Sequence, residues 1–267
     1  MDEMSTLVAV NIGSSRIAVS RIEEGTPGSV DVVAADDIRG ARALICSAVG
    51  VGDSDASTAC LVVASVNPVA ERALLASVAD LDGLTVRRMG HDLPIPQPHM
   101  LGDDHTTGQD RLLNALAAYD LFKEACAVVD AGTAITVDFV DGEGVYHGGA
   151  IAPGGRLQLQ SLHDGTASLP VVALARPEDE SNTFAKTTPD AMLHGVYFGV
   201  RGMVRTLVER YAERFGAYPH VIATGGDAAL FFEDDDFVEV IVPDLTLRGI
   251  ALTTVAAVAD HPGASRG

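Results

Sequence analysis

Two stretches of the chain share one pattern of apolar and polar positions. Each opens with a short run of small apolar residues, at 7–10 in the first and at 127–129 in the second, as in a buried strand. A polar residue and a glycine follow, and apolar residues then resume at alternate positions. We therefore predict two β-hairpins, one opening each half of the chain.

The remaining pattern alternates further strands with helices. Apolar residues with a helical period, Pro189 near the start of one segment, and Gly-rich turns mark the boundaries. This mixture indicates an α/β protein, and we predict two domains, 1–125 and 126–267. Helices are expected at 39–49, from about Pro68, at 110–125, over 156–170 where the helix leads to a turn, and at 188–216 and 245–260, with a further helix start after the Gly-Gly turn at 225–226. Strands are expected at 59–63, 85–90, 145–155 and 220–224.

Composition limits the possible partners. The chain has 267 residues, of which 47% are hydrophobic, so it can bury one large or two medium cores. Its formal net charge of −19 argues against nucleic acid as a partner, because phosphate contacts need Lys and Arg. No apolar run approaches the roughly 18 residues that a membrane helix needs, so we expect no membrane partner.

The expected location is the cytoplasm. The first ten residues lack a basic region and a cleavage site, which predicts no secretion signal. Cys46, Cys60 and Cys126 lie in apolar surroundings without paired spacing. We therefore expect buried free thiols in a reducing compartment, and no metal site built from cysteine.

The two hairpin tips carry groups that suit a phosphate and its counter-cation. They combine backbone N–H groups, hydroxyl side chains and the carboxylate of Asp130. An ordinary hairpin turn would also explain the glycines, and one tip alone does not decide between these interpretations. The candidate residues are Asn11, Gly13, Ser14, Ser15 and Arg16 in the first tip, and Asp130, Gly132, Thr133 and Thr136 in the second.

Two further loops carry candidate chemistry. Asp110 and Arg111 stand at a predicted helix start, where the aspartate is either a general base or a helix cap. Arg111 would bind an anion. Gly225 and Gly226 follow a strand and either pack flat against a planar ligand or form a tight turn.

These segments, taken in order, resemble the type III pantothenate kinases of the acetate and sugar kinase/Hsp70/actin superfamily. The resemblance rests on "VAVNIGSS", "GQDRLLNALAA", "VVDAGTAITVDFV", "GGAIAPGG", "KTTPDAMLHGV" and "VIATGGDA". It implies two duplicated RNase H-like domains of the actin-like ATPase type that face each other across a cleft. It also implies ATP-dependent phosphorylation of pantothenate to 4′-phosphopantothenate, the first step of coenzyme A biosynthesis.

The resemblance also assigns roles to single residues. Asp110 matches the proton acceptor, and Asp130 matches the ligand of an activating K⁺ or NH₄⁺ ion. Mg²⁺ would accompany ATP, and the protein would be a homodimer. The matching substrate-binding residues are Gly108, Gln109, Arg111 and Thr188. The matching ATP- and phosphate-binding residues are those of the two tips, with Gly225 and Gly226.

Two departures from the family pattern leave other functions open. Asn11 stands where the family has an aspartate, and residues 90–107 lack the family's substrate tyrosine. An amide holds a hard cation less well than a carboxylate does. The alternatives to an active pantothenate kinase are a kinase-like accessory protein that binds nucleotide or pantothenate, and a sugar or acetate kinase or phosphatase.

Overall fold

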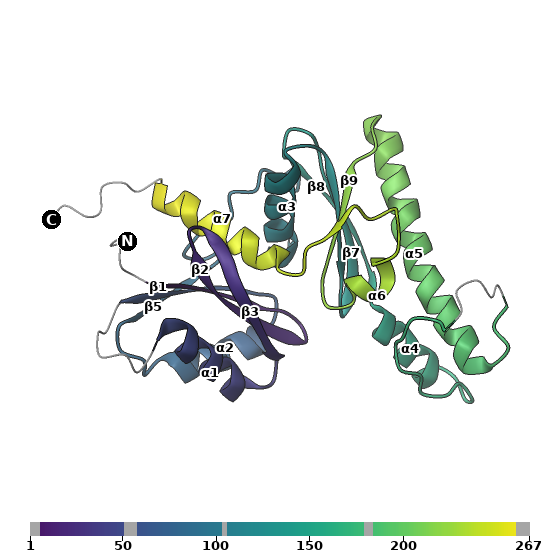
Figure 1. Cartoon of the computed structure of the whole chain (residues 1–267), viewed down its shortest axis with the longest axis horizontal. Coiled ribbons are helices and arrows are strands. Elements are labelled where there is room, and N and C mark those ends of the chain that lie inside the picture. The colour runs from purple at the N-terminus through teal and green to yellow at the C-terminus, as the bar shows by residue number, and fades with distance from the viewer. Residues whose placement is uncertain (1–5, 51–57, 103–105, 179–183, 260–267) are drawn as a thin grey trace. The chain divides into compact units, whose positions relative to one another are not determined.

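A computed structural model describes residues 6–50, 58–102, 106–178 and 184–259. The chain forms two compact units, each with its own five-stranded sheet (Figure 1). The first unit comprises Met1–Gln97, Asp103–Ala117 and Asp244–Gly267, and the second comprises Pro98–Gly102 and Ala118–Pro243. The predicted domain boundary at 125 stays a prediction.

The sheet of the first unit has the strand order β3-β2-β1-β4-β5. Strand β1 pairs antiparallel with β2 and parallel with β4, while β2–β3 is antiparallel and β4–β5 is parallel. The strands are β1 (Thr6–Ile12), β2 (Arg16–Glu23), β3 (Thr26–Ala34), β4 (Ala59–Ser65) and β5 (Leu84–Arg88).

Helices cover both faces of this sheet, which explains the continuous apolar runs of β1 and β4. Val8 and Val10 pack with Ile45 of α1 (Ile38–Val49) and Leu74 of α2 (Pro68–Val78). Ala9 lies on the opposite face. That face packs against Leu113 of α3 (Gln109–Phe122) and Leu247 and Ile250 of α7 (Leu245–Ala259).

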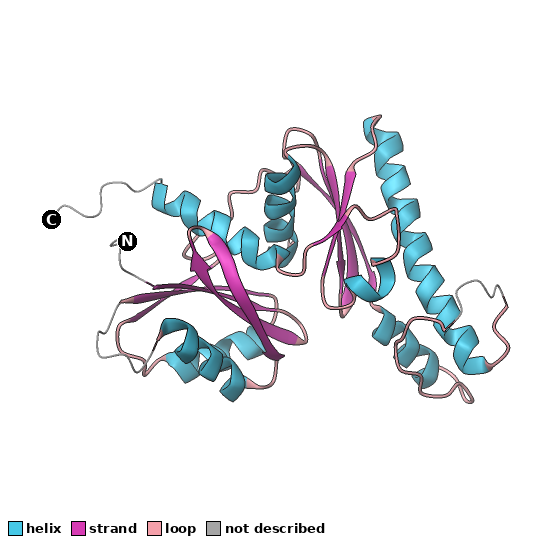
Figure 2. Ribbon diagram, viewed as in Figure 1, coloured by secondary structure: helices cyan, strands magenta, loops and turns pink. Residues whose placement is uncertain are grey.

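The second unit repeats this topology. Its strand order is β10-β9-β6-β7-β8, and β6 pairs antiparallel with β7 and parallel with β9, as β1 does with β2 and β4. The common order supports the predicted duplication (Figure 2). The strands are β6 (Cys126–Ala131), β7 (Ala134–Val140), β8 (Tyr146–Pro153), β9 (His220–Thr224) and β10 (Val240–Ile241), and the helices are α4 (Gly155–Asp164), α5 (Thr188–Phe215) and α6 (Ala228–Phe232).

The long helix α5 buries one apolar stripe against this second sheet. Val196, Val200, Val204 and Val208 recur every four residues and join the core that contains Val137. Thr187 caps the helix by accepting a hydrogen bond from the Asp190 N–H, and Pro189 occupies its first turn, where no N–H is needed. The predicted helix start is therefore confirmed.

The predicted hairpins, helices and buried strands are all present, but two strands were missed. Strand β3 is mostly exposed and carries Pro27 and Gly28, so it lacks the apolar alternation that marks a half-buried strand. Strand β10 has two residues, which is too short to give a pattern. In the described residues, no helix is long and apolar enough to cross a membrane.

Candidate functional site

The first tip is the turn between β1 and β2. The Gly13 N–H donates to the Arg16 carbonyl at 2.9 Å, which closes the turn, and the Ile12 carbonyl accepts from the Val66 N–H at 3.0 Å. Asn11 is half-buried on β1, whereas Ser14, Ser15 and Arg16 are exposed. The tip therefore presents two hydroxyls and a guanidinium to solvent at the carboxyl end of β1.

The start of α3 lies beside this tip. Ile12 is paired in register with Ser65 at the end of β4, and the Ser65 N–H donates to Gln109 Oε1 at 3.4 Å. The Gln109 amide also packs against Gly90, where an added Cβ would lie 2.9 Å from Nε2. The predicted substrate segment 108–111 and the first tip thus meet at one end of the first sheet.

Asp110 is half-buried in the first turn of α3. Its Oδ1 accepts from the Arg111 N–H at 2.8 Å, and that same N–H lies 3.2 Å from the Gly108 carbonyl. A carboxylate is stabilised by N–H groups at a helix N-terminus. Asp110 is the second residue of α3 and accepts from the N–H of the next residue, so this contact is not that of a helix cap, and the role of general base stays to be tested.

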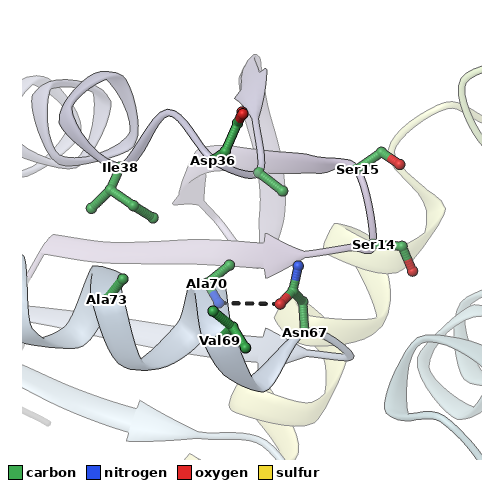
Figure 3. A pocket seen from close by; sticks show the side chains of 9 residues that line it. Ser14, Ser15, Asp36, Ile38, Asn67, Val69, Ala70 and Ala73 are labelled. Atoms are coloured by element: carbon green, nitrogen blue, oxygen red, sulfur yellow. Dashed lines mark hydrogen bonds between the residues drawn. The ribbon is translucent and has the colours of Figure 1, made fainter.

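A pocket of about 520 Å³ opens on the α1 and α2 side of the first tip. Asn67 caps α2 at its edge by accepting from the Ala70 N–H at 3.1 Å. Figure 3 shows the Ser14 and Ser15 hydroxyls pointing away from the apolar wall that Ile38 and Ala73 form. The apolar wall of the pocket and the serine hydroxyls of the first tip therefore face different directions.

The second tip is the turn between β6 and β7. Asp130 is half-buried and is paired in register with Thr136 on β7 and Thr224 on β9. The Gly132 N–H donates to the Ala134 carbonyl at 2.9 Å, and Thr133 is exposed. The structure therefore brings Asp130 and Thr136 side by side on the two strands of this hairpin, with Thr133 in the turn between them.

The glycine pair after β9 packs against this turn. Gly225 has φ +91°, and a Cβ there would lie 2.4 Å from Asp130 Oδ1 and 2.4 Å from the Ala131 carbonyl oxygen. Gly226, the next residue, is exposed. The predicted residues of both loops thus lie together, and only a glycine at 225 allows this close approach.

An ion pair between an exposed arginine and a buried aspartate at the second tip escaped the sequence analysis. Arg156 Nη1 donates to Asp227 Oδ1 at 2.5 Å and also contacts Oδ2. The Asp227 side chain is 3% exposed and the Arg156 side chain is 60% exposed. Their separation of 71 residues left no local pattern, although Asp227 directly follows the glycine pair.

Among the described residues, no hydrogen bond joins Thr188 to the second tip. It is the first residue of α5, it is exposed, and it follows the helix cap Thr187. Residues 182 and 183, an alternative Asn-Thr pair, lie outside the described residues. The assignment of Thr188 as a substrate-binding residue therefore stays a prediction.

The expected free thiols are present. Burial raises the pKa of the Cys126 thiol to about 12 and also raises that of Cys60. All three cysteines are free, and Cys46 is half-buried. In the described part of the chain, no three His, Cys, Asp or Glu side chains gather as a metal site.

The comparisons with known proteins decide the family. A family model described as type III pantothenate kinase matches residues 7–210. The chain belongs to this family. Among curated type III pantothenate kinases, that of Rhodospirillum rubrum is 49% identical over 145 residues, 54% of this chain and 55% of the relative. That of Treponema pallidum is 37% identical over 211 residues, 78% of this chain and 74% of the relative.

Solved structures with low sequence identity support the actin-like ATPase fold that the family implies. The activator of the 2-hydroxyisocaproyl-CoA dehydratase from Clostridium difficile, with bound ADPNP, has a TM-score of 0.54 at 13% identity. The matched region covers 98% of this chain and 99% of the activator's chain. The psk41 ParM protein has a TM-score of 0.51 at 10% identity, covering 97% and 99%. For the first relatives of the pantothenate kinase family, this chain spans little more than half their length, 55% and 57%.

Proposed function

We propose that this protein catalyses the ATP-dependent phosphorylation of pantothenate to 4′-phosphopantothenate, the first step of coenzyme A biosynthesis. One observation carries the proposal in a chain of this family. The Gly-Gln-Asp-Arg segment opens α3 beside the first tip, held there by the bond between Gln109 Oε1 and the Ser65 N–H. Asp110 and Arg111 therefore stand beside a turn that suits phosphate, where they would act as base and as anion-binding arginine.

Asp110 would accept the proton of the pantothenate hydroxyl as that oxygen attacks the γ-phosphate of ATP. Arg111 follows it directly in the first turn of α3 and would hold the pantothenate carboxylate through a bidentate contact. Gly108 and Gln109 shape this end of the site, and Thr188 would add a contact to the substrate. Positioning and charge neutralisation would account for most of the rate.

Each tip would contact phosphate oxygens of ATP. Hydroxyls of Ser14, Ser15 and Thr133 are exposed, and the backbone N–H groups of tight turns suit phosphate oxygens. The Asp130 carboxylate fits K⁺ or NH₄⁺, and Mg²⁺ would neutralise phosphate charge when bound with ATP. Asn11 offers an amide oxygen, so it would bind Mg²⁺ more weakly than an aspartate does.

A homodimer is part of the proposal and is supported by the outer face of α5. Gly195, Gly199 and Gly202 follow one another along that helix, and an added Cβ at each would meet no atom within 4 Å. Phe198 on the same helix is 41% exposed. A face of small residues beside an exposed aromatic ring allows close packing of a second helix. A cytoplasmic location is also proposed, since the reaction consumes ATP.

Asn11 favours a second candidate function, an accessory protein that binds nucleotide or pantothenate without transfer. A coupled assay of ADP release separates the two, with pantothenate, acetate or glucose as acceptor and K⁺, NH₄⁺ or Na⁺ as the cation. Of the three acceptors, we expect turnover only with pantothenate, and we expect it to be faster with K⁺ or NH₄⁺ than with Na⁺. Nucleotide binding with no turnover above background, at millimolar Mg²⁺ or Mn²⁺, would instead establish the accessory function.

A further inference from the structure

The ion pair between Arg156 and Asp227 joins the two elements that flank the second tip. Arg156 is the second residue of α4, and Asp227 directly precedes α6. The guanidinium contacts both carboxylate oxygens of Asp227. Because that carboxylate is almost fully buried, the arginine neutralises a charge that would otherwise be strongly destabilising.

Backbone contacts place both partners against the turn that carries Asp130. The Asp227 N–H donates to the Ala131 carbonyl at 2.9 Å, and the Gly154 N–H donates to the Thr133 carbonyl at 2.9 Å. A Cβ at Gly154 would lie 2.1 Å from the Gly132 carbonyl oxygen, so α4 begins in direct contact with the turn. The arginine is therefore fixed two residues from that contact.

The exposure of the two partners is unequal, and this asymmetry is what a ligand could use. The Arg156 side chain is 60% exposed although Asp227 is 3% exposed. A guanidinium has five N–H donors, and two contacts to one carboxylate leave others available to solvent. The hydrogen bonds given above join Arg156, Asp227, Gly154, Ala131 and Thr133 at the second tip. Of these described residues, Arg156 is the only one with a positive charge.

We propose that Arg156 binds a phosphate oxygen of the nucleotide at the second tip, with Asp227 as its positioning residue. This inference rests on the proposed ATP site and adds to it a residue that no motif singled out. Asp130 and Asp227 would both repel a polyphosphate. A fixed guanidinium beside them offsets one of these charges and offers the forked geometry that phosphate prefers.

Direct binding of nucleotides, measured by calorimetry without pantothenate, tests the inference. We expect Arg156→Gln to weaken ADP binding about tenfold or more, as the loss of a charge-assisted hydrogen bond does, while adenosine binding stays within twofold. Arg156→Lys should fall between the two, because it keeps the charge and loses the fork. Arg42→Gln, which breaks the surface pair with Asp80, is the matched control and should leave both affinities unchanged.

The double variant Arg156→Gln with Asp227→Asn separates phosphate binding from simple neutralisation. It removes both charges, so no buried carboxylate is left unpaired and the protein should fold. If Arg156 contacts phosphate, ADP binding stays weak in the double variant. Recovery of wild-type affinity would overturn the inference and leave the proposed function intact, whereas absence of ADP binding by the wild-type protein would overturn both.

Discussion

The two hairpin tips occupy the same place in two sheets of the same strand order, yet they are built differently. At the first tip, a Cβ on Gly13 would lie 3.4 Å from the Arg16 carbonyl oxygen, an ordinary contact. At the second tip, a Cβ on the matching Gly132 would also have room, 3.9 Å from Asp130 Oδ1, but a Cβ on Gly154 or Gly225, which pack against this turn, would overlap backbone oxygens. The topology thus fixes where a tip lies, and the residues that follow neighbouring strands fix how tightly it is held.

This difference suggests a division of labour. The second tip is enclosed by the starts of α4 and α6 and by the ion pair between Arg156 and the buried Asp227, which suits a preorganised phosphate and cation site. The first tip is open, with exposed serines beside a pocket and the start of α3. The first tip is thus the less enclosed of the two, and it lies beside the segment that carries Asp110.

Substitutions at Gly225, which packs against the second tip, and at Gly13 in the first tip should give the largest difference between the tips. Gly225→Ala would place a methyl group 2.4 Å from two oxygens at φ +91°, so we expect a loss of about 2–4 kcal/mol in the free energy of unfolding. Gly13→Ala should cost less than about 1 kcal/mol. Urea denaturation measures both, and equal losses would mean that the second tip is not the tighter one.

A change at Asn11 makes the first tip resemble the second. Asn11→Asp adds a carboxylate where the family has one, and we expect about tenfold less Mg²⁺ to be needed for half-maximal rate, equal to 1.4 kcal/mol in cation binding. Rates are measured over a Mg²⁺ titration at saturating pantothenate. A raised KM for ATP would show instead that the site is arranged around the amide, and an unchanged titration would place Asn11 away from the metal.

At the end of the second sheet that lies away from the tip, His220 should make a smaller, pH-dependent contribution to stability. His220 begins β9, where the first unit has Ala59, and its ring contacts Glu239 at 2.7 Å and Glu124 at 3.2 Å. The Glu239 hydrogen bond, with that of Glu124, raises the pKa of His220 above its usual 6.5, although desolvation opposes the shift. The interaction of the charged His220 ring with the two glutamates therefore stabilises the folded protein fully below pH 6.5. This stabilisation is lost as the pH rises through the raised pKa.

We expect this effect to be small because the His220 side chain is 35% exposed. The melting temperature of the wild-type protein should exceed that of His220→Gln by roughly 1–2 °C more at pH 5.5 than at pH 8.5. Comparing the two pH values removes the constant loss of stacking on Phe122, whose ring lies 4.5 Å away. A difference that grows with pH would contradict the assignment of charge to this cluster.

The sequence predicts the parts of the molecule that depend on local pattern. Both hairpins and the long helix α5 follow from apolar periodicity and from Pro and Gly at their ends. Strand β3 could not be found this way, because an exposed edge strand needs no apolar face. The pairs Ser65–Gln109 and Arg156–Asp227 join residues 44 and 71 positions apart, so only the folded chain shows them.

The most direct test of the account is detection of 4′-phosphopantothenate by mass spectrometry after incubation with ATP, pantothenate, Mg²⁺ and K⁺. Asp110→Asn keeps an oxygen to accept from the Arg111 N–H, so it should fold normally while kcat falls roughly 10²–10⁴-fold. Asp120→Asn on the same helix, which breaks an exposed pair with Lys123, is the control and should keep its rate. No product from the wild-type protein, or full activity in Asp110→Asn, would contradict the account.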